Sequence, residues 1–307
     1  MKKTGMILFI LLLMLSLSTG CSNQENSITE SNNTTDNNLE QISNKASQSD
    51  ADMFTDRDYR TAYDENESIL IHLNGDSATA SSNSVKISGS TVQITEEATY
   101  IISGTLNNGI ILVDAEDTAK LQIVLNGVSI TNESSAALYI LSADKVFVTL
   151  AEGTENTLAN GGSFIAIDEN NIDAVVFSKQ DLTFNGTGNL IITSPNGNGI
   201  VGKDDLVFTG GNYTINTSSH GIEANDSVRI TGTTQITVDA GKDGIHCENN
   251  DDTSLGFIYI SAGTLNIEAE GDGISASAYM QIVDGTFSVL AGGGSENGSS
   301  QSSNTWG

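Results

Sequence analysis

The sequence contains very little proline, cysteine or aromatic residue. Of its 307 residues, one is proline, two are cysteine and 6% are aromatic. With so few cysteines, a framework of several disulfides is excluded. With Pro195 alone interrupting the chain, nearly every backbone amide can join a β-ladder. The low aromatic content and the 31 glycines favour thin strands and tight corners over a bulky globular core.

Basic residues are also scarce. Twelve lysines and arginines face 39 acidic residues, which gives a formal net charge of −27. Nucleic acid is therefore excluded as a partner, because its binding requires a positive surface. A charge of this sign favours cations, or surfaces that cations bridge, as partners.

Long apolar runs are missing except near the N-terminus. Two lysines precede the apolar stretch 7–17, which is too short to span a membrane comfortably. The stretch ends in Leu17-Ser18-Thr19-Gly20-Cys21, which resembles a bacterial lipoprotein signal. We therefore predict a signal peptide at 1–20, lipidation at Cys21 and anchoring on the extracellular face of the bacterial cell membrane. The alternative is ordinary secretion with cleavage near Gly20.

Polar, low-complexity segments flank the rest of the chain. Residues 21–52 are predicted to be a disordered tether and residues 292–307 a flexible Gly/Ser tail, which leaves 53–291 for the folded domain. If Cys21 is acylated, Cys247 has no disulfide partner. Because it shares strand parity with Ile245, Cys247 is interpreted as a small core residue rather than a nucleophile.

A repeat dominates this domain. Short apolar strands recur around a Gly-Ile pair, and the tightest copies lie 22 and 23 residues apart. That period predicts an all-β solenoid, a parallel β-helix with coils of about 22 to 25 residues, in which neighbouring coils bury one another's apolar faces. The clearest copies begin at Gly199, Gly221, Gly244 and Gly273, and looser copies at Gly109, Ala137 and Ala174.

Several runs together resemble a known family. They are Ile69-Leu70-Ile71-His72-Leu73-Asn74-Gly75, Tyr100-Ile101-Ile102-Ser103-Gly104-Thr105-Leu106, Leu125-Asn126-Gly127-Val128-Ser129-Ile130 and Leu150-Ala151-Glu152-Gly153-Thr154-Glu155-Asn156-Thr157-Leu158. The stretch from Phe54 to Ala291 is similar to clostridial-type carbohydrate-binding domains related to polysaccharide lyases. The resemblance implies a right-handed parallel β-helix, bound calcium ions and affinity for plant-type polysaccharides, notably acidic ones.

The residue before each Gly-Ile corner is a candidate metal ligand. These residues are Asp173, Asn198, His220, Asp243 and Asp272. Stacked coils would place them about 4.8 Å apart, where two carboxylates repel by roughly 3.5 kcal/mol at an effective dielectric of about 20. A Ca²⁺ ion with oxygens at about 2.4 Å on opposite sides would fit that spacing and turn repulsion into attraction.

Asp243 and Asp272 form the best neighbouring pair, and further acids follow the corners closely enough to complete a shell. The expected calcium ligands are Asp173, Asp204, Asp205, Glu223, Asp226, Asp243, Glu248 and Asp272. His220 is interpreted as a turn or surface residue, because imidazole is a poor ligand for a hard cation. The alternative is that the acids only solvate turns.

A second column is formed by alternate residues of the first strand of each repeat. Its members are Phe147, Thr183, Val207, Arg229, Tyr259 and Gln281. An aromatic ring could stack on a pyranose and a guanidinium could pair with a uronate, so Arg229, Phe257, Tyr259 and Tyr279 are the expected carbohydrate-binding residues. The alternatives are a face of mixed side chains or a ridge that the N-terminal region covers.

These observations predict a calcium-stabilised, cell-surface monomer that binds polysaccharide without catalysis. One alternative is a calcium-dependent polysaccharide lyase, in which Lys203, Lys242 or Arg229 would abstract the proton next to a uronate carboxylate. Another is a purely structural surface protein, which would melt in a calcium-dependent way but bind no glycan.

Overall fold

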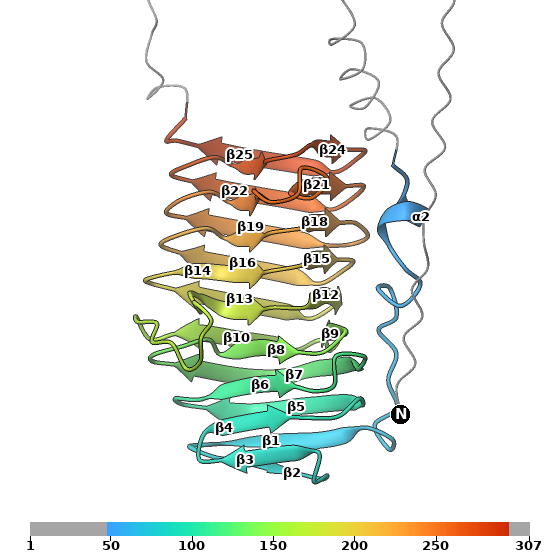
Figure 1. The fold of residues 1–307 in the computed structure, drawn as a ribbon, viewed down its shortest axis with the longest axis vertical. Coiled ribbons are helices and arrows are strands. Elements are labelled where there is room, and N and C mark those ends of the chain that lie inside the picture. The colour runs from blue at the N-terminus through green and yellow to red at the C-terminus, as the bar shows by residue number, and fades with distance from the viewer. Residues whose placement is uncertain (1–47, 295–307) are drawn as a thin grey trace, which may run out of the picture. The chain divides into compact units, whose positions relative to one another are not determined.

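The computed structural model describes residues 48–294, which form a stack of short parallel strands (Figure 1). The helix in this part of the chain is α2 (Asp50–Met53), a single turn. None of the described residues belongs to a helix long and apolar enough to cross a membrane. Residues 1–20, the tether up to residue 47, Cys21 and residues 295–307 lie outside the described part.

Each full coil contributes one strand to each of three faces. The first face contains β9 (Lys145–Leu150), β12 (Asp181–Gly186), β15 (Asp205–Phe208), β18 (Ser227–Ile230), β21 (Phe257–Ile260) and β24 (Met280–Ile282). The second contains β10 (Glu155–Asn160), β13 (Asn189–Ser194), β16 (Asn212–Thr217), β19 (Gln235–Ala240), β22 (Thr264–Ala269) and β25 (Thr286–Ala291). These two faces join through β7 (Lys120–Asn132), which also leads to β5 (Thr99–Leu106), β1 (Ile69–Gly75) and β2 (Ala78–Ala80).

The third face is a separate nine-stranded sheet. It contains β3 (Val85–Ser88), β4 (Thr91–Ile94), β6 (Ile110–Asp114), β8 (Leu138–Ser142), β11 (Ala174–Ser178), β14 (Asn198–Gly202), β17 (Ile222–Ala224), β20 (Ile245–Cys247) and β23 (Ile274–Ala276). All its pairings are parallel except β3 with β4. The predicted all-β fold of long parallel sheets is thus confirmed, while its right-handed sense stays a prediction.

The repeat has the predicted register in the later coils. Ile200 pairs with Ile222, Ile222 with Ile245, and Ile245 with Ile274. Among the looser copies, Ala137-Leu138 has the predicted register, whereas the copies at Gly109 and Ala174 were assigned one residue too early, because Leu138 pairs with Ile111 and Val176, and Val176 pairs with Ile200. Loops of different length precede these strands, and they hide the register from sequence spacing.

The glycines serve two separate purposes. Gly211, Gly263 and Gly285 have positive φ, as the turn before the second strand requires. Gly199, Gly221, Gly244 and Gly273 do not have positive φ. A Cβ at Gly221 would lie 2.5 Å from both the Gly244 carbonyl oxygen and Val238 Cγ1, so here glycine permits close approach of neighbouring coils.

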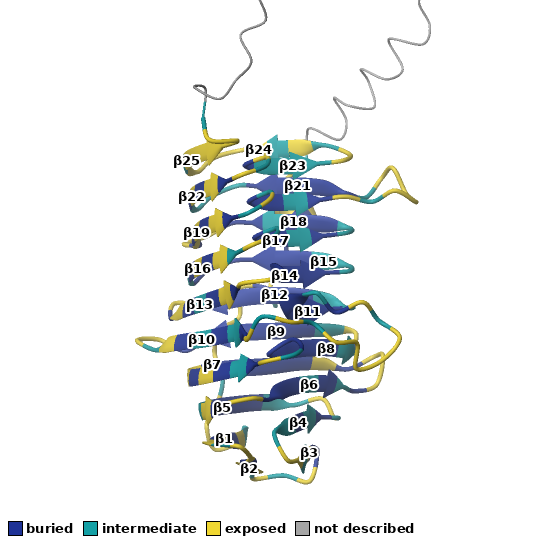
Figure 2. Cartoon of the chain, turned by 90° about the vertical axis from the view of Figure 1, so that its left-hand side faces the viewer, coloured by how far each residue is buried: buried dark blue, intermediate teal, exposed yellow. Residues whose placement is uncertain are grey.

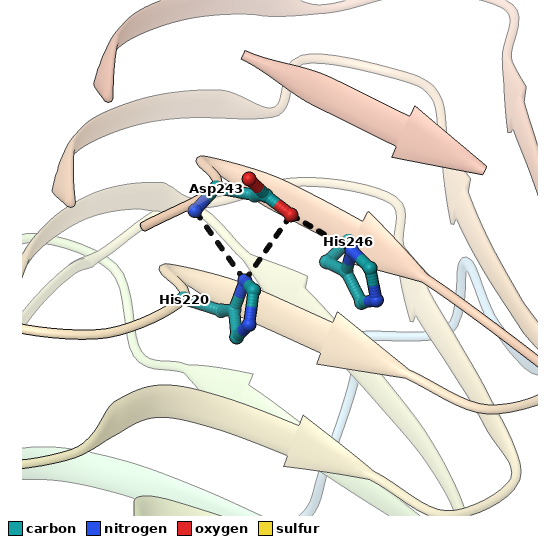
Figure 3. A group of neighbouring side chains, drawn as sticks. All are labelled: His220, Asp243 and His246. Carbon is teal, nitrogen blue, oxygen red and sulfur yellow. Dashed lines mark hydrogen bonds and ion pairs between the residues drawn. The ribbon is translucent and has the colours of Figure 1, made fainter. Parts of the chain in front are cut away.

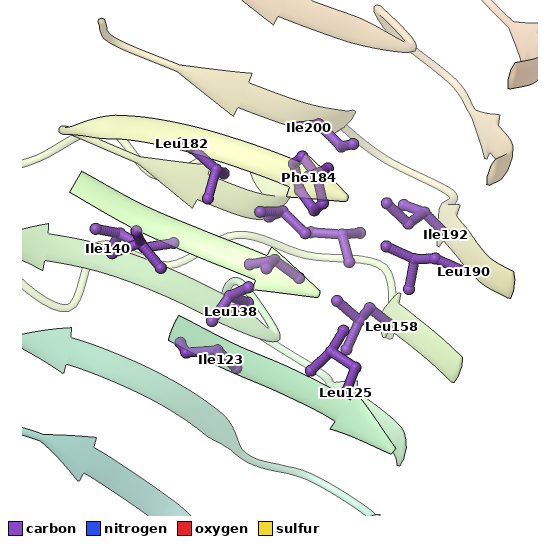
Figure 4. Close-up of a cluster of buried hydrophobic side chains, with 14 of the residues drawn as sticks. Ile123, Leu125, Leu138, Ile140, Leu158, Leu182, Phe184, Leu190, Ile192 and Ile200 are labelled. Carbon is purple, nitrogen blue, oxygen red and sulfur yellow. The ribbon is translucent and has the colours of Figure 1, made fainter. Parts of the chain in front are cut away.

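Apolar side chains from all three faces fill the interior of the coil (Figure 4). Phe184 and Phe208 of adjacent coils stack with ring centroids 5.1 Å apart. Cys247 is fully buried in register with Ala224 and Ala276, as a small core residue should be. Burial raises the pKa of its thiol to about 12, which keeps it protonated and unreactive.

Residues 48–63, named here the N-terminal strap, lie across the first face. The strap contacts the last coil where Gln281 Nε2 donates to the Gln48 carbonyl over 2.8 Å, and Tyr63 packs near Ile101 and Val124 of early coils. Residues 48–52 were assigned to the disordered tether, and that boundary was wrong. They make specific contacts that their polar composition does not reveal.

Candidate functional site

The column expected to bind sugar exists, but the strap covers it. Thr183, Val207, Arg229, Tyr259 and Gln281 lie in register on consecutive strands. Tyr259 is 1% exposed, packs against the ring of Phe54 and donates from Oη to Asp50 Oδ1 over 2.9 Å. Its ring is therefore not available to a sugar.

The other three residues of that expectation are committed to protein contacts as well. Arg229 Nη2 lies 2.6 Å from Asp205 Oδ2, and Nη1 donates to the Met53 carbonyl. Phe257 is 7% exposed and stacks on Tyr279 with ring centroids 5.0 Å apart. The assignment of Arg229, Phe257, Tyr259 and Tyr279 as a sugar-binding ridge is corrected to an interface for the strap.

The third face divides into a covered apolar half and an open polar half. Its outward column runs through Tyr139, Phe177 and Val201 to Glu223, His246 and Ser275. Loop 161–173 covers the apolar half, where Tyr139 Oη donates to Asp168 Oδ2 over 2.7 Å. The polar half is of intermediate exposure and lies at the β17–β23 end of the stack (Figure 2).

Three side chains meet at the corner that leads into this polar half (Figure 3). Asp243 Oδ2 lies 2.9 Å from His246 Nδ1 and 3.5 Å from His220 Nδ1, and the two imidazole rings stack with centroids 4.7 Å apart. His220, interpreted from the sequence as a turn or surface residue, does lie at a corner and is partly exposed, but it also contacts Asp243 and His246. Within residues 48–294, this is the one group of three or more histidine, cysteine or acidic side chains whose ligand atoms all lie within 4.8 Å of one another.

The expected pairing of Asp243 with Asp272 across a cation is not formed. Asn198, His220, Asp243 and Asp272 do lie two residues before paired isoleucines, as predicted. However, Asp243 Oδ1 accepts the backbone N–H of Asp272 over 2.7 Å, and the Asp272 side chain is exposed. The carboxylate of Asp243 is directed to the imidazoles instead.

Asp173 lies outside that column, because Ala174 is the residue paired with Asn198. Its Oδ1 is nevertheless buried without a hydrogen-bond partner. Burial and the nearby charge of Glu223 raise the pKa of Asp173. One carboxylate oxygen of Asp173 is thus buried without a hydrogen bond.

A second acidic corner lies between the third and first faces. Asp204 and Asp226 occupy equivalent places in consecutive coils, one residue before the paired Asp205 and Ser227. Burial, then the charges of Asp181, Asp226 and Asp205, raise the pKa of Asp204 to about 6. The pKa values of Asp181 and Asp226 are raised as well, each chiefly by burial and next by Asp205. Asp205 itself is bound to Arg229 and accepts from Ser227 Oγ.

Glu223 and Glu248 line a cavity of about 290 Å³ beside this corner, together with Asn225, His246, Asn249, Asn250 and Asp251. Asn249 Nδ2 donates to Asp226 Oδ1 over 3.2 Å and so links the cavity to the acidic corner. Glu223 Oε1 lies 3.8 Å from Lys203 Nζ, and Glu248 Oε2 lies 3.4 Å from His246 Nε2. The cavity is polar, partly open and lined by carboxylate and amide oxygens that can bind a cation.

Two candidate site residues were not predicted from the sequence. His246 follows Asp243 by three residues and aligns with Glu223, which the repeat register could have revealed. Asp181 aligns with Asp205, one coil earlier, and the same register would have found it. Neither residue precedes a Gly-Ile corner, so the repeat motif by itself does not single them out.

The comparisons with known proteins agree with this architecture. The family model described as "Carbohydrate-binding domain-containing protein" matches residues 88–306. A protein of that description from Acetivibrio thermocellus is 36% identical over 211 residues, which cover 68% of this chain and 73% of the relative. A solved structure described as a polysaccharide lyase-like protein from C. thermocellum, gadolinium derivative, is similar with a TM-score of 0.67 and 34% identity, and covers 74% of this chain and 93% of its own. The chain belongs to the family of carbohydrate-binding domain-containing proteins.

Proposed function

We propose that this protein binds acidic, pectin-like polysaccharide through calcium ions held at the corner of Asp181, Asp204 and Asp226, without catalysis. The observation that carries the proposal is the stacking of carboxylates from consecutive coils beside a polar cavity, where burial and neighbouring acids raise the pKa values of Asp204 and Asp226. Membership of a carbohydrate-binding family supports the polysaccharide part.

The donor set fits calcium. All three side chains offer carboxylate oxygens, which Ca²⁺ prefers, and Asp204 makes no side-chain hydrogen bond to any residue in 48–294. Asp173 and Glu223 form a further pair of coupled acids with an unpartnered buried oxygen. The oxygens of Asp181, Asp204 and Asp226 do not all lie within 4.8 Å of one another, as the ligand atoms of the histidine group do. Calcium would therefore also take oxygens from water and from the glycan.

A uronate polymer would otherwise be repelled by this surface. Glu223, Glu248 and Asp251 give the cavity a negative lining. A calcium ion shared between protein and sugar carboxylates would remove that repulsion, while Asn225 and Asn249 could bind hydroxyl groups. The lyase alternative loses Arg229 as a base, because the strap and Asp205 occupy its guanidinium.

Affinity electrophoresis of the full chain in gels containing polygalacturonate tests the proposal. Calcium should retard migration, and a chelator should abolish the retardation. Asp204→Asn together with Asp226→Asn should weaken it strongly, whereas Asp239→Asn on the exposed part of β19 should not. Retardation that a chelator leaves unchanged would remove calcium from the mechanism, and ultraviolet absorbance that grows with time would show a lyase.

Anchoring at Cys21 and an extracellular location belong to the same proposal. Mass spectrometry of the mature N-terminus should find an acylated cysteine in the native protein and none in a Cys21→Ser variant. Cleavage near residue 20 without acylation would favour ordinary secretion.

A further inference from the structure

The side chains of His220, Asp243 and His246 offer donor atoms that suit a borderline metal ion such as Zn²⁺ better than calcium. Two imidazole nitrogens and one carboxylate oxygen are donors typical of Zn²⁺ and its neighbours, whereas Ca²⁺ takes oxygen ligands. Ligand atoms around a tetrahedral zinc ion lie roughly 3.3 Å apart, given zinc–ligand distances of 2.0–2.1 Å. The two distances from Asp243 Oδ2 to the histidine nitrogens, 2.9 and 3.5 Å, lie on either side of that value.

Hydrogen bonding does not account for these short contacts. Asp243 donates its backbone N–H to His220 Nδ1 over 3.4 Å, so this nitrogen presents a lone pair. The same nitrogen lies 3.5 Å from Asp243 Oδ2, a contact that either a proton on the imidazole or a metal ion between the two atoms makes favourable, and a metal at Nδ1 would replace the hydrogen bond from the Asp243 N–H. His246 Nδ1 is buried and has no hydrogen-bond partner, although Asp243 Oδ2 is only 2.9 Å away.

Neighbouring groups contact the three proposed ligands and orient them, as groups that hydrogen-bond to metal ligands do in zinc proteins. Glu248 Oε2 lies 3.4 Å from His246 Nε2, where it can accept that proton and leave Nδ1 free for metal. The Asp272 N–H holds Asp243 Oδ1, which directs Oδ2 toward the imidazoles.

We propose that His220 Nδ1, Asp243 Oδ2 and His246 Nδ1 bind one Zn²⁺-class ion, which links the coil of β17 to the coil of β20. Three protein ligands leave a further coordination position for water or for an oxygen of a bound ligand. The site is separate from the calcium corner of Asp181, Asp204 and Asp226 and does not depend on glycan binding.

Calorimetric titration of the full chain with zinc sulfate in calcium-containing buffer tests this site. One Zn²⁺ should bind, and added Ca²⁺ should not displace it. His246→Gln should weaken binding by more than about 100-fold, and Glu248→Gln by about 10-fold or more, since loss of an orienting partner alone costs 10–100-fold. His72→Gln is the matched control, because His72 is exposed on β1 and, among the described residues, its side chain hydrogen-bonds only Ser103.

Cobalt provides a second readout. Co²⁺ added to the full chain should give visible absorption bands of a tetrahedral complex, and the His220→Gln/His246→Gln double variant should lose them while its circular dichroism stays that of a β-protein. Zinc stoichiometry and affinity that the double variant retains would overturn the proposal. Displacement by Ca²⁺ at equal concentration would overturn it too.

Discussion

Lys145 Nζ lies 2.9 Å from Asp58 Oδ1, and this ion pair attaches the strap to the first face of the solenoid. Thr183 Oγ1 donates to the same oxygen over 2.6 Å, and the Asp58 carbonyl accepts from Thr209 Oγ1. Both partners of the pair are largely buried. Besides the contacts of Gln48, Asp50 and Met53, the strap is therefore held by the Asp58 side chain, which is inserted among polar groups of the wall.

Removing that charge should destabilise the protein. Asp58→Asn leaves Lys145 without its partner in a largely buried place, which costs about 3–5 kcal/mol of unfolding free energy. Urea unfolding followed by circular dichroism measures the loss. Asp56→Asn, two residues earlier and exposed, is the control and should change stability little. Equal stability of the two variants would show that the strap is not held through Asp58.

Acid should weaken the same attachment. Burial alone would raise the pKa of Asp58, but hydrogen bonds from Thr183 and Thr55 and the charge of Lys145 outweigh burial and lower it below 3.8. Because the folded-state pKa is the lower one, the stabilisation is complete above the unfolded value and is lost as pH falls through the folded value. The stability difference between wild type and Asp58→Asn should be constant from pH 7 to pH 5 and shrink below about pH 4. Urea titrations at each pH would reveal a contrary, constant difference.

Calcium should reverse the effect of a substitution at Asp204. In a chelator, Asp204→Asn should raise the melting temperature at pH 7, because it removes a carboxylate whose ionised form burial and three neighbouring acids disfavour. In calcium, wild type should gain stability and the variant should gain less. Differential scanning fluorimetry under both conditions measures the two shifts. A variant that gains as much as wild type would place calcium elsewhere.

The close contact between coils should make Gly221 intolerant of a side chain. Gly221→Ala sets a Cβ 2.5 Å from the Gly244 carbonyl oxygen, and such overpacking costs about 1–3 kcal/mol. Gly89→Asn is the matched control, since no atom lies within 4 Å of its Cβ position and asparagine tolerates its φ of +58°. Equal midpoints of urea unfolding for both variants would contradict the packing argument.

The register of the stacked strands could be predicted from the sequence better than the segments that cover their outer side chains. Ile200, Ile222 and Ile245 repeat at nearly constant spacing, because the interior of each coil accepts only small changes of length, and that spacing fixes the register. Loop 161–173 follows no such rule, and the register assigned to Asp173 was accordingly wrong by one residue. The outward column of Tyr259 was predicted as a column, but alternation along a strand does not tell whether water or another segment lies over it.

The candidate site was found only in part for a related reason. Asp204, Asp226, Glu223 and Glu248 were recognised from their nearness to corners, and the structure gathers them around one polar region. The direction of a side chain at a corner depends on local turns, which spacing does not encode. Asp243 was therefore paired with Asp272 rather than with His220 and His246.

The route of the strap determines at which end of the stack the described chain begins. Gln48 lies beside Gln281 in the last coil, and Gly294 follows β25 of that same coil, so both ends of the described chain leave from one end of the stack. A force applied at residue 48 would therefore act on the final coil first and detach the strap from there toward Asp58. The opposite end of the stack, with β2 and β3, carries neither end of the described residues.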